Sequence, residues 1–197
     1  MTLYLSMAAF ALASSITPGP VNIVALSSGA QFGFNASLRH VTGATLGFTL
    51  LLMLVGLGVH EILSLWPGLT IAILWAGVFF LLYMAYQLAT DNGQLGQGGQ
   101  QNEPSYWYGA LLQWLNPKAW LASIASMGAF VGDGEILLLW QFAMIYFVIC
   151  YASVASWAYA GAMLSRLLQS PRNVRRFNRL MALLLVLSAY YLLLEGV

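Results

Sequence analysis

The most restrictive feature of this sequence is a break inside its first long apolar run. Residues 14–22 read SSITPGPVN, whereas residues 3–12 and 21–26 on either side have the apolar character of one membrane-spanning helix. Pro18 and Pro20 lack a backbone N–H and clash with the preceding helical turn, so the helix cannot continue through them. Broken backbone at membrane depth is tolerated only where protein buries it or where it lines a wet cavity. The break is therefore expected to serve such a site.

Composition indicates that the chain lies in lipid. Of its 197 residues, 60% are hydrophobic and 7% are charged, whereas a soluble domain has about 25% charged residues. We therefore expect an integral membrane protein. The net charge is +1 and the sequence has no basic patch, so nucleic-acid binding is not expected. The one cysteine, Cys150, cannot form an intrachain disulfide, and we expect a buried, inert thiol.

Six apolar segments follow one another along the chain. They cover approximately residues 3–30, 41–59, 69–89, 106–131, 136–165 and 180–194. About 20 residues cross a bilayer as a helix, so the short last segment is expected to gain length from Arg179, whose side chain can reach the interface. Residues 31–40 and 166–179 are expected to be loops. Residues 91–104 are rich in Gly and Gln, which predicts a flexible linker.

The basic residues predict the orientation of these segments. With six spans, loops one, three and five share one face, and they carry all six arginines, whereas loops two and four carry neither Lys nor Arg. Because cytoplasmic loops are enriched in Lys and Arg, loops one, three and five are predicted to be cytoplasmic and both termini to lie outside. The six are Arg39, Arg166, Arg172, Arg175, Arg176 and Arg179.

The fourth segment repeats the interruption of the first. Pro117 lies 99 positions after Pro18, and the same offset aligns Ser126 with Ser27, Gly128 with Gly29, Ala129 with Ala30, and Gly132 with Gly33. Gly/Pro-interrupted segments at corresponding positions of two halves indicate a transporter substrate site. The predicted fold is therefore an all-α membrane protein of six transmembrane helices, with helices one and four broken. It forms one transporter domain, in which the linker 91–104 joins two inverted three-helix repeats, residues 1–90 and 105–197.

A broken helix can bind an amino-acid zwitterion with its own backbone. The half that follows the break offers free N–H groups and the positive end of the helix dipole to a carboxylate. The half that precedes it offers carbonyls to an ammonium, and asparagine amides can donate and accept. The alternative for the hydroxyls of Ser14, Ser15 and Thr17 is that they bond their own backbone, as membrane hydroxyls often do. The predicted substrate-binding residues are Thr17, Pro18, Gly19, Pro20, Asn22, Asn116, Pro117 and Lys118.

Lys118 is the only charged residue well inside a segment. A charge at that depth costs about 3 kcal/mol or more. We expect it to pair with the substrate carboxylate or with carbonyls freed at Pro18; the alternative is that it reaches to the outer interface. Trp114 and Trp120 flank it in sequence and could form a wall of the pocket.

Two further groups of residues have open roles. His40 and His60 lie at the two ends of the second segment and are expected at the membrane interfaces, where they could take part in coupling. Gly43 and Gly47 form a GxxxG pattern, which lets helices approach closely. The pattern could serve packing within the chain or a homodimer.

The motifs resemble those of one family. Residues 17–20 read TPGP and are followed by Asn22, then by Gly43 and Gly47, and residues 116–118 read NPK. In this combination and in its six-segment length, the chain resembles the LysE/RhtB family of amino-acid exporters. Within that family IVALSS, LWAG and SYW look most like the cysteine/O-acetylserine exporter branch; they begin at residues 23, 74 and 105. The resemblance implies efflux of amino acids or their derivatives across a bacterial inner membrane, with no cofactor.

One position departs from that family. Many members have an acidic residue directly after Pro-Gly-Pro, whereas this chain has Val21 there and no Asp or Glu inside any segment. The departure disfavours proton coupling by a carboxylate at the break. It also disfavours a cationic substrate, which would need a buried anion.

The sequence therefore favours a secondary transporter that exports small neutral amino acids of the cysteine, O-acetylserine, threonine or homoserine type. A passive channel or a structural membrane subunit is the alternative. An intramembrane enzyme is disfavoured because a metal or hydrolase site needs histidines and acids together, and the two histidines lie at opposite ends of one segment. No metal site is expected.

Overall fold

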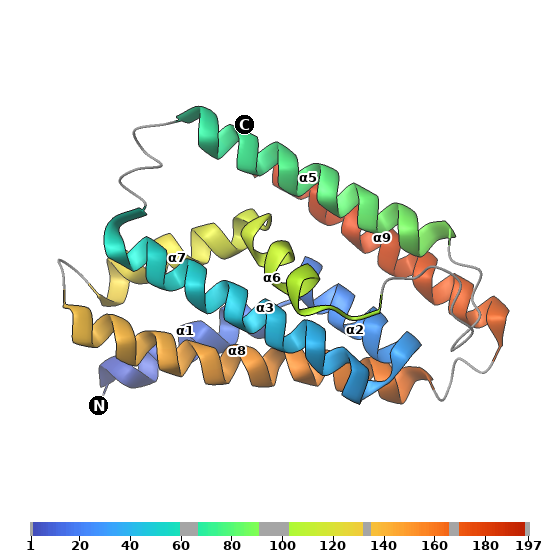
Figure 1. Ribbon diagram of the computed structural model, residues 1–197, viewed down its shortest axis with the longest axis horizontal. Helices are drawn as coiled ribbons and strands as arrows, with labels where there is room; N and C mark the ends of the chain where they lie inside the picture. Colours follow the sequence, from blue (N-terminus) through green and yellow to red (C-terminus); the bar gives the residue numbers. More distant parts are fainter. Residues whose placement is uncertain (1, 60–66, 91–102, 132–134, 166–169, 196–197) are drawn as a thin grey trace.

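The computed structural model describes residues 2–59, 67–90, 103–131, 135–165 and 170–195, and all regular structure within these ranges is helical (Figure 1). The helices of the first half are α1 (Thr2–Ile16), α2 (Pro20–Phe32), α3 (Phe34–Leu54), the short π-helix η1 (Val55–Val59) and α5 (Pro67–Thr90). Those of the second half are α6 (Tyr106–Trp114), α7 (Pro117–Phe130), α8 (Ile136–Ser165) and α9 (Pro171–Glu195).

Several of these helices are built to cross a membrane. In the described part of the chain, Phe34–Gly58 and Ile136–Leu164 are each long and apolar enough to span. The bent pair Leu3–Ile16 and Pro20–Phe32, with an angle of 60° between its helices, qualifies as a third span if counted as one. In Figure 1, α5 and α9 pack together along one edge of the bundle, and α8 runs past α1 and α2 along the opposite edge. The expected class, an all-α membrane protein, is thereby confirmed.

The expected loop at residues 31–40 is wrong. Gly33, with φ 82°, makes the connection alone, because glycine tolerates a positive φ. Helix α3 begins at the next residue, so Asn35, Arg39 and His40 are helical. His40 is also buried between helices, since it is only 1% exposed. His60 lies outside the described residues.

The expected basic loop is wrong over residues 171–179. Helix α9 begins at Pro171 rather than near residue 180, as proline favours the first helical position. The Ser170 hydroxyl accepts a hydrogen bond from the Asn173 backbone N–H at 3.3 Å, which caps this helix start. The four arginines from 172 to 179 are exposed on the first turns. The other predicted loop residues 166–169, and linker residues 91–102, lie outside the described part.

The fourth segment breaks where the sequence predicts. Helix α6 ends at Trp114, and α7 begins at Pro117. Trp114 Nε1 donates to the Gly47 carbonyl at 3.1 Å, and Trp120 Nε1 donates to the Trp114 carbonyl at 2.8 Å. The two tryptophans thus bond backbone carbonyls around the break, and neither lines the pocket described below.

Close helix crossings depend on glycines. A Cβ added at Gly29 of α2 would overlap the Ala158 carbonyl of α8, and one at Gly161 of α8 would overlap the Leu26 carbonyl of α2. Gly43 and Gly47 of α3 contact α6 in the same way. The GxxxG pattern therefore serves packing within the chain.

The carbonyls released at the first break bond with side chains of the protein. The Asn22 amide donates to the carbonyls of Ser15 and Thr17, both at 2.9 Å. Trp157 Nε1 of α8 donates to the Ile16 carbonyl at 3.1 Å. These bonds supply what lipid cannot, so the break is stable at membrane depth.

We predict that Gly29→Ala destabilises the α2–α8 crossing, because the new methyl group meets backbone rather than a movable side chain. Overpacking of this kind costs about 1–3 kcal/mol, which thermal unfolding in detergent will register as a lower melting temperature. Gly128→Ala is the matched control, since a Cβ at Gly128 of α7 meets nothing within 4 Å. Equal melting temperatures for the two variants would contradict this account of the crossing.

We predict that Asn22→Leu, a substitution of similar size, leaves the Ser15 carbonyl without its donor. An unpaired buried backbone group costs about 1–3 kcal/mol, so the variant should unfold at a lower temperature or denaturant concentration. The exposed Asn35, at the start of α3, provides the control variant Asn35→Leu. Unchanged stability of Asn22→Leu would mean that water or another group satisfies the break.

Candidate functional site

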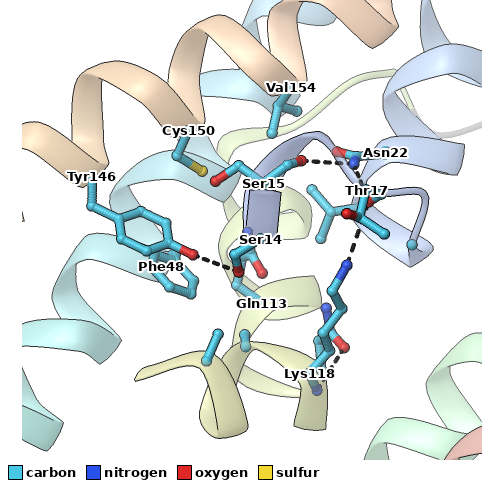
Figure 2. A pocket seen from close by; sticks show the side chains of 15 residues that line it. Ser14, Ser15, Thr17, Asn22, Phe48, Gln113, Lys118, Tyr146, Cys150 and Val154 are labelled. Carbon is cyan, nitrogen blue, oxygen red and sulfur yellow. Dashed lines mark hydrogen bonds between the residues drawn. The ribbon is translucent and has the colours of Figure 1, made fainter. Parts of the chain in front are cut away.

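One pocket lies between the two helix breaks (Figure 2). It holds about 400 Å³ of empty space, counted together with the solvent at its open mouth. The first break contributes Thr17, Gly19, Val21 and Asn22, and the second contributes Asn116 and Lys118. Segments about a hundred residues apart in sequence therefore form one site.

Five of the eight residues predicted from the sequence line this pocket. They are Thr17, Gly19, Asn22, Asn116 and Lys118. Pro18 and Pro20 do not line it; Pro18 lies in the connection between α1 and α2, and Pro20 opens α2. Pro117 opens α7. The prolines therefore shape the two breaks, whereas their neighbours face the pocket.

Lys118 connects the two breaks directly. Its Nζ donates to the Thr17 carbonyl at 3.4 Å, as the dashed line in Figure 2 marks. Gly19 lies against the same ammonium, since a Cβ there would be 3.6 Å from Nζ. The ammonium is thus held at the pocket wall by a backbone oxygen.

The two helices that begin at the breaks have different N-termini. Asn116 caps α7, because its side-chain oxygen accepts a bond from the Lys118 backbone N–H at 3.2 Å. Helix α2 has Gly19 at the corresponding position and no side-chain cap. Val21 and Asn22, in the first turn of α2, face the pocket. The α2 N-terminus therefore offers N–H groups and a positive dipole end that no side chain of the cap uses.

The opposite wall comes from α3, α6 and α8. Tyr146 donates its hydroxyl to Ser14 Oγ at 2.8 Å, and Phe48 stacks on its ring with centroids 4.4 Å apart. Gln113 of α6 lines the pocket and is 6% exposed. Sequence reasoning missed these three residues as pocket members. Gln113 carried a signal, a lone amide three positions before Asn116, but Phe48 and Tyr146 lie in uninterrupted apolar runs.

The hydroxyls near the break behave differently from one another. Thr17 donates to the Ala13 carbonyl of its own helix, which is the local bonding expected for membrane hydroxyls. Ser14 accepts from Tyr146 instead. Ser15 Oγ is buried, has no hydrogen-bond partner among the described residues, and belongs to a residue that lines the pocket. Cys150 is buried beside it and also lines the pocket.

The chemistry of the pocket fits a small zwitterion. It places donors, at Lys118 and the start of α2, within the same space as hydroxyl and amide oxygens. Its lining residues include neither Asp nor Glu. No group of three or more His, Cys, Asp or Glu that could hold a metal ion exists in the described part of the chain.

Comparison with known proteins gives a consistent result. The family model described as LysE type translocator matches residues 12–196. Cysteine/O-acetylserine efflux proteins of Escherichia coli K12 and of Shigella flexneri serotype 5b are each 32% identical to the chain over 184 residues. Each alignment covers 91% of this chain and 92% of the relative. No solved structure is significantly similar to the chain. The chain, a membrane protein with a pocket between two broken helices, belongs to the LysE family of translocators.

Proposed function

We propose that this protein is a secondary transporter that exports small neutral amino acids or their derivatives across the bacterial inner membrane. The single observation that carries the proposal is the contact of Lys118, from the second break, with Thr17 of the first break at the wall of one pocket. The names of the relatives, cysteine/O-acetylserine efflux proteins, support substrates of that type; threonine and homoserine have a similar size and charge.

The substrate carboxylate would bind at the start of α2. Val21 and Asn22 offer backbone N–H groups there, and the Lys118 ammonium lies beside Gly19. A carboxylate carries a full negative charge, so it attracts the Lys118 ammonium more strongly than a neutral carbonyl does. The bound carboxylate would therefore compete with Thr17 for this ammonium.

The substrate ammonium would bind oxygens on the other side of the pocket. The Ser15 hydroxyl has no hydrogen-bond partner among the described residues, and the Gln113 amide can direct its oxygen to a ligand. The substrate side chain would contact Ala119, Ala122 and Val154, which are small or apolar. Because no Asp or Glu of the described residues lines the pocket, a second positive charge on the substrate would remain unpaired, which disfavours lysine-like substrates.

The helix pairings support six crossings arranged as an inverted repeat. In such a repeat the helices of the first half, α1, α2, α3 and α5, correspond in order to those of the second half, α6, α7, α8 and α9. The α3–α6 contact then has its counterpart in the α8–α1 contact, and both are present. The contact of α2 with α8 likewise corresponds to that of α7 with α3, and α5–α9 and α3–α8 are pairs of equivalents. Under this proposal residues 1–90 and 105–197 are the repeats, and both termini are periplasmic. In Figure 1 both termini lie toward the same end of the bundle.

A passive channel or a structural subunit is the competing function. A channel conducts in proportion to the gradient, whereas a transporter with one central site saturates. The test is efflux of labelled amino acids from loaded vesicles, with and without a pH gradient. A saturable flux supports the proposal, and a flux that rises linearly with concentration, or no flux, contradicts it.

We predict that Lys118→Met lowers the rate of amino-acid export by about 10- to 100-fold, while folded protein remains in the membrane. The reason is that hydrogen bonds to charged groups contribute about 1.5–3 kcal/mol, and about 1.4 kcal/mol is a factor of ten. Efflux from vesicles measures the effect. Arg172→Met removes an exposed cation at the start of α9, away from the pocket, and should export normally. Normal export by Lys118→Met would overturn the proposed site.

We predict that cells expressing the protein gain resistance to toxic analogues of small neutral amino acids but not to analogues of lysine or arginine. The pocket has no anion for a second positive charge. Growth on a panel of analogues, compared with cells that express Lys118→Met, is the measurement. Resistance confined to cationic analogues would contradict the neutral pocket described here.

A further inference from the structure

A second pocket lies beside the later turns of α2. It encloses about 610 Å³ with its mouth and is lined by residues of α2, α3, α5 and α6 together with residues 103–105 before α6. Its polar lining includes Ser27, Gln31, His40, Glu103 and Tyr108. Polar side chains are costly on a surface that faces lipid, so this pocket differs from a packing defect between apolar helices.

The position of this pocket matches the face from which an exporter takes its substrate. It is formed by the end of α2, the start of α3, the end of α5 and the start of α6. These are the helix ends that the proposed topology places at the cytoplasmic side. In Figure 1 the turn between α2 and α3 and the end of α5 lie toward the end of the bundle opposite to the termini.

One hydrogen bond links the lining of the second pocket to that of the central pocket. His40 lines the second pocket, and its Nε2 lies within hydrogen-bond distance, 3.4 Å, of the Val21 carbonyl oxygen. Val21 lines the central pocket. The linings of the two pockets therefore meet where His40 contacts the first turn of α2.

One buried polar group of the second pocket has no partner in the part of the chain that the structure describes. Tyr108, a lining residue, has a buried hydroxyl with no hydrogen-bond partner among the described residues, and a buried polar group without a partner usually indicates a missing water or ligand. At the mouth, the Glu103 carboxylate accepts from Arg39 at 3.3 Å. A zwitterion carries both opposite charges, so it can bind Glu103 with its ammonium and Arg39 with its carboxylate.

We infer that the second pocket is a cytoplasmic entry site, which binds the same small neutral amino acid before it passes His40 into the central pocket. The inference rests on the proposed export function. Glu103 binds the substrate ammonium at the mouth, and the Tyr108 hydroxyl and the Gln31 amide oxygen bind polar groups of the substrate inside. The Gln31 amide nitrogen already donates to Ser27 Oγ at 2.9 Å. The two sites act in series, and only the entry site faces the cytoplasm.

The first test fills the pocket. Leu88 of α5 lines it, so Leu88→Trp would occupy its volume. Tyr86→Trp is the matched control, since Tyr86 is on the same helix, 68% exposed, and outside the lining. Export of labelled O-acetylserine is measured in vesicles of known orientation. Leu88→Trp should raise the half-saturating cytoplasmic concentration about tenfold, while the half-saturating periplasmic concentration in counterflow stays that of the wild type.

The second test uses a position that cannot disturb the core. Glu103 is exposed, so Glu103→Gln should keep the fold and should raise the cytoplasmic half-saturating concentration several-fold, about 3- to 10-fold. Glu135→Gln, at an exposed acid before α8 and outside both pockets, is its control.

The outcomes separate the two proposals. If the wild type exports nothing, the proposed function is wrong. If the wild type exports but Leu88→Trp and Glu103→Gln match their controls, the entry site is wrong and the function stands. If the half-saturating concentrations rise equally from both sides, the second pocket acts only through the central site, and the inference is also overturned.

Discussion

The structure depends on how it satisfies the backbone groups that Pro18 and Pro20 release inside the membrane. Lipid provides no hydrogen bonds, so each freed carbonyl needs a partner from the protein. Asn22 donates to the carbonyls of Ser15 and Thr17, and Trp157 donates to that of Ile16. These donors come from α2 and α8, which also pack at the glycine crossing. The break is thus held by the same helix pair that positions the pocket wall.

The difference between the two breaks determines where a ligand can bind. Asn116 closes the N-terminus of α7 with its own side chain, and the two nearby tryptophans bond backbone carbonyls. The N-terminus of α2 follows a glycine and has no side-chain cap. Two similar interruptions of sequence therefore differ in chemistry. At the second break the protein's own side chains bond the freed backbone groups, and Lys118 supplies a cation. At the first break the N–H groups at the start of α2 remain for a ligand.

The sequence predicted the breaks and the charged group but only part of the fold and site. Pro18 and Pro117 marked the interruptions because proline disrupts the helical turn in which it lies, an effect that needs no tertiary contact. Helix α8 has the bounds of the apolar segment predicted for it. The prediction of a loop at residues 31–40 was wrong because polar residues were interpreted as exposed, whereas His40 is buried between helices. The start of α9 was missed because its exposed arginines were interpreted as a loop, whereas they lie on the first turns of a helix. Phe48 and Tyr146 could not be assigned, since their roles depend on how α3 and α8 meet.

Lys118 gives the proposed transport cycle a physical constraint. Its ammonium bonds a neutral carbonyl, which compensates a charge less well than a carboxylate does. In the proposed function the substrate carboxylate displaces that carbonyl. Because Thr17 belongs to the first break and Lys118 to the second, the displacement would remove a bond between the two halves at the moment of binding. Occupancy of the site and the contact between the repeats are then linked through one side chain, and a substrate without a carboxylate could not make the exchange.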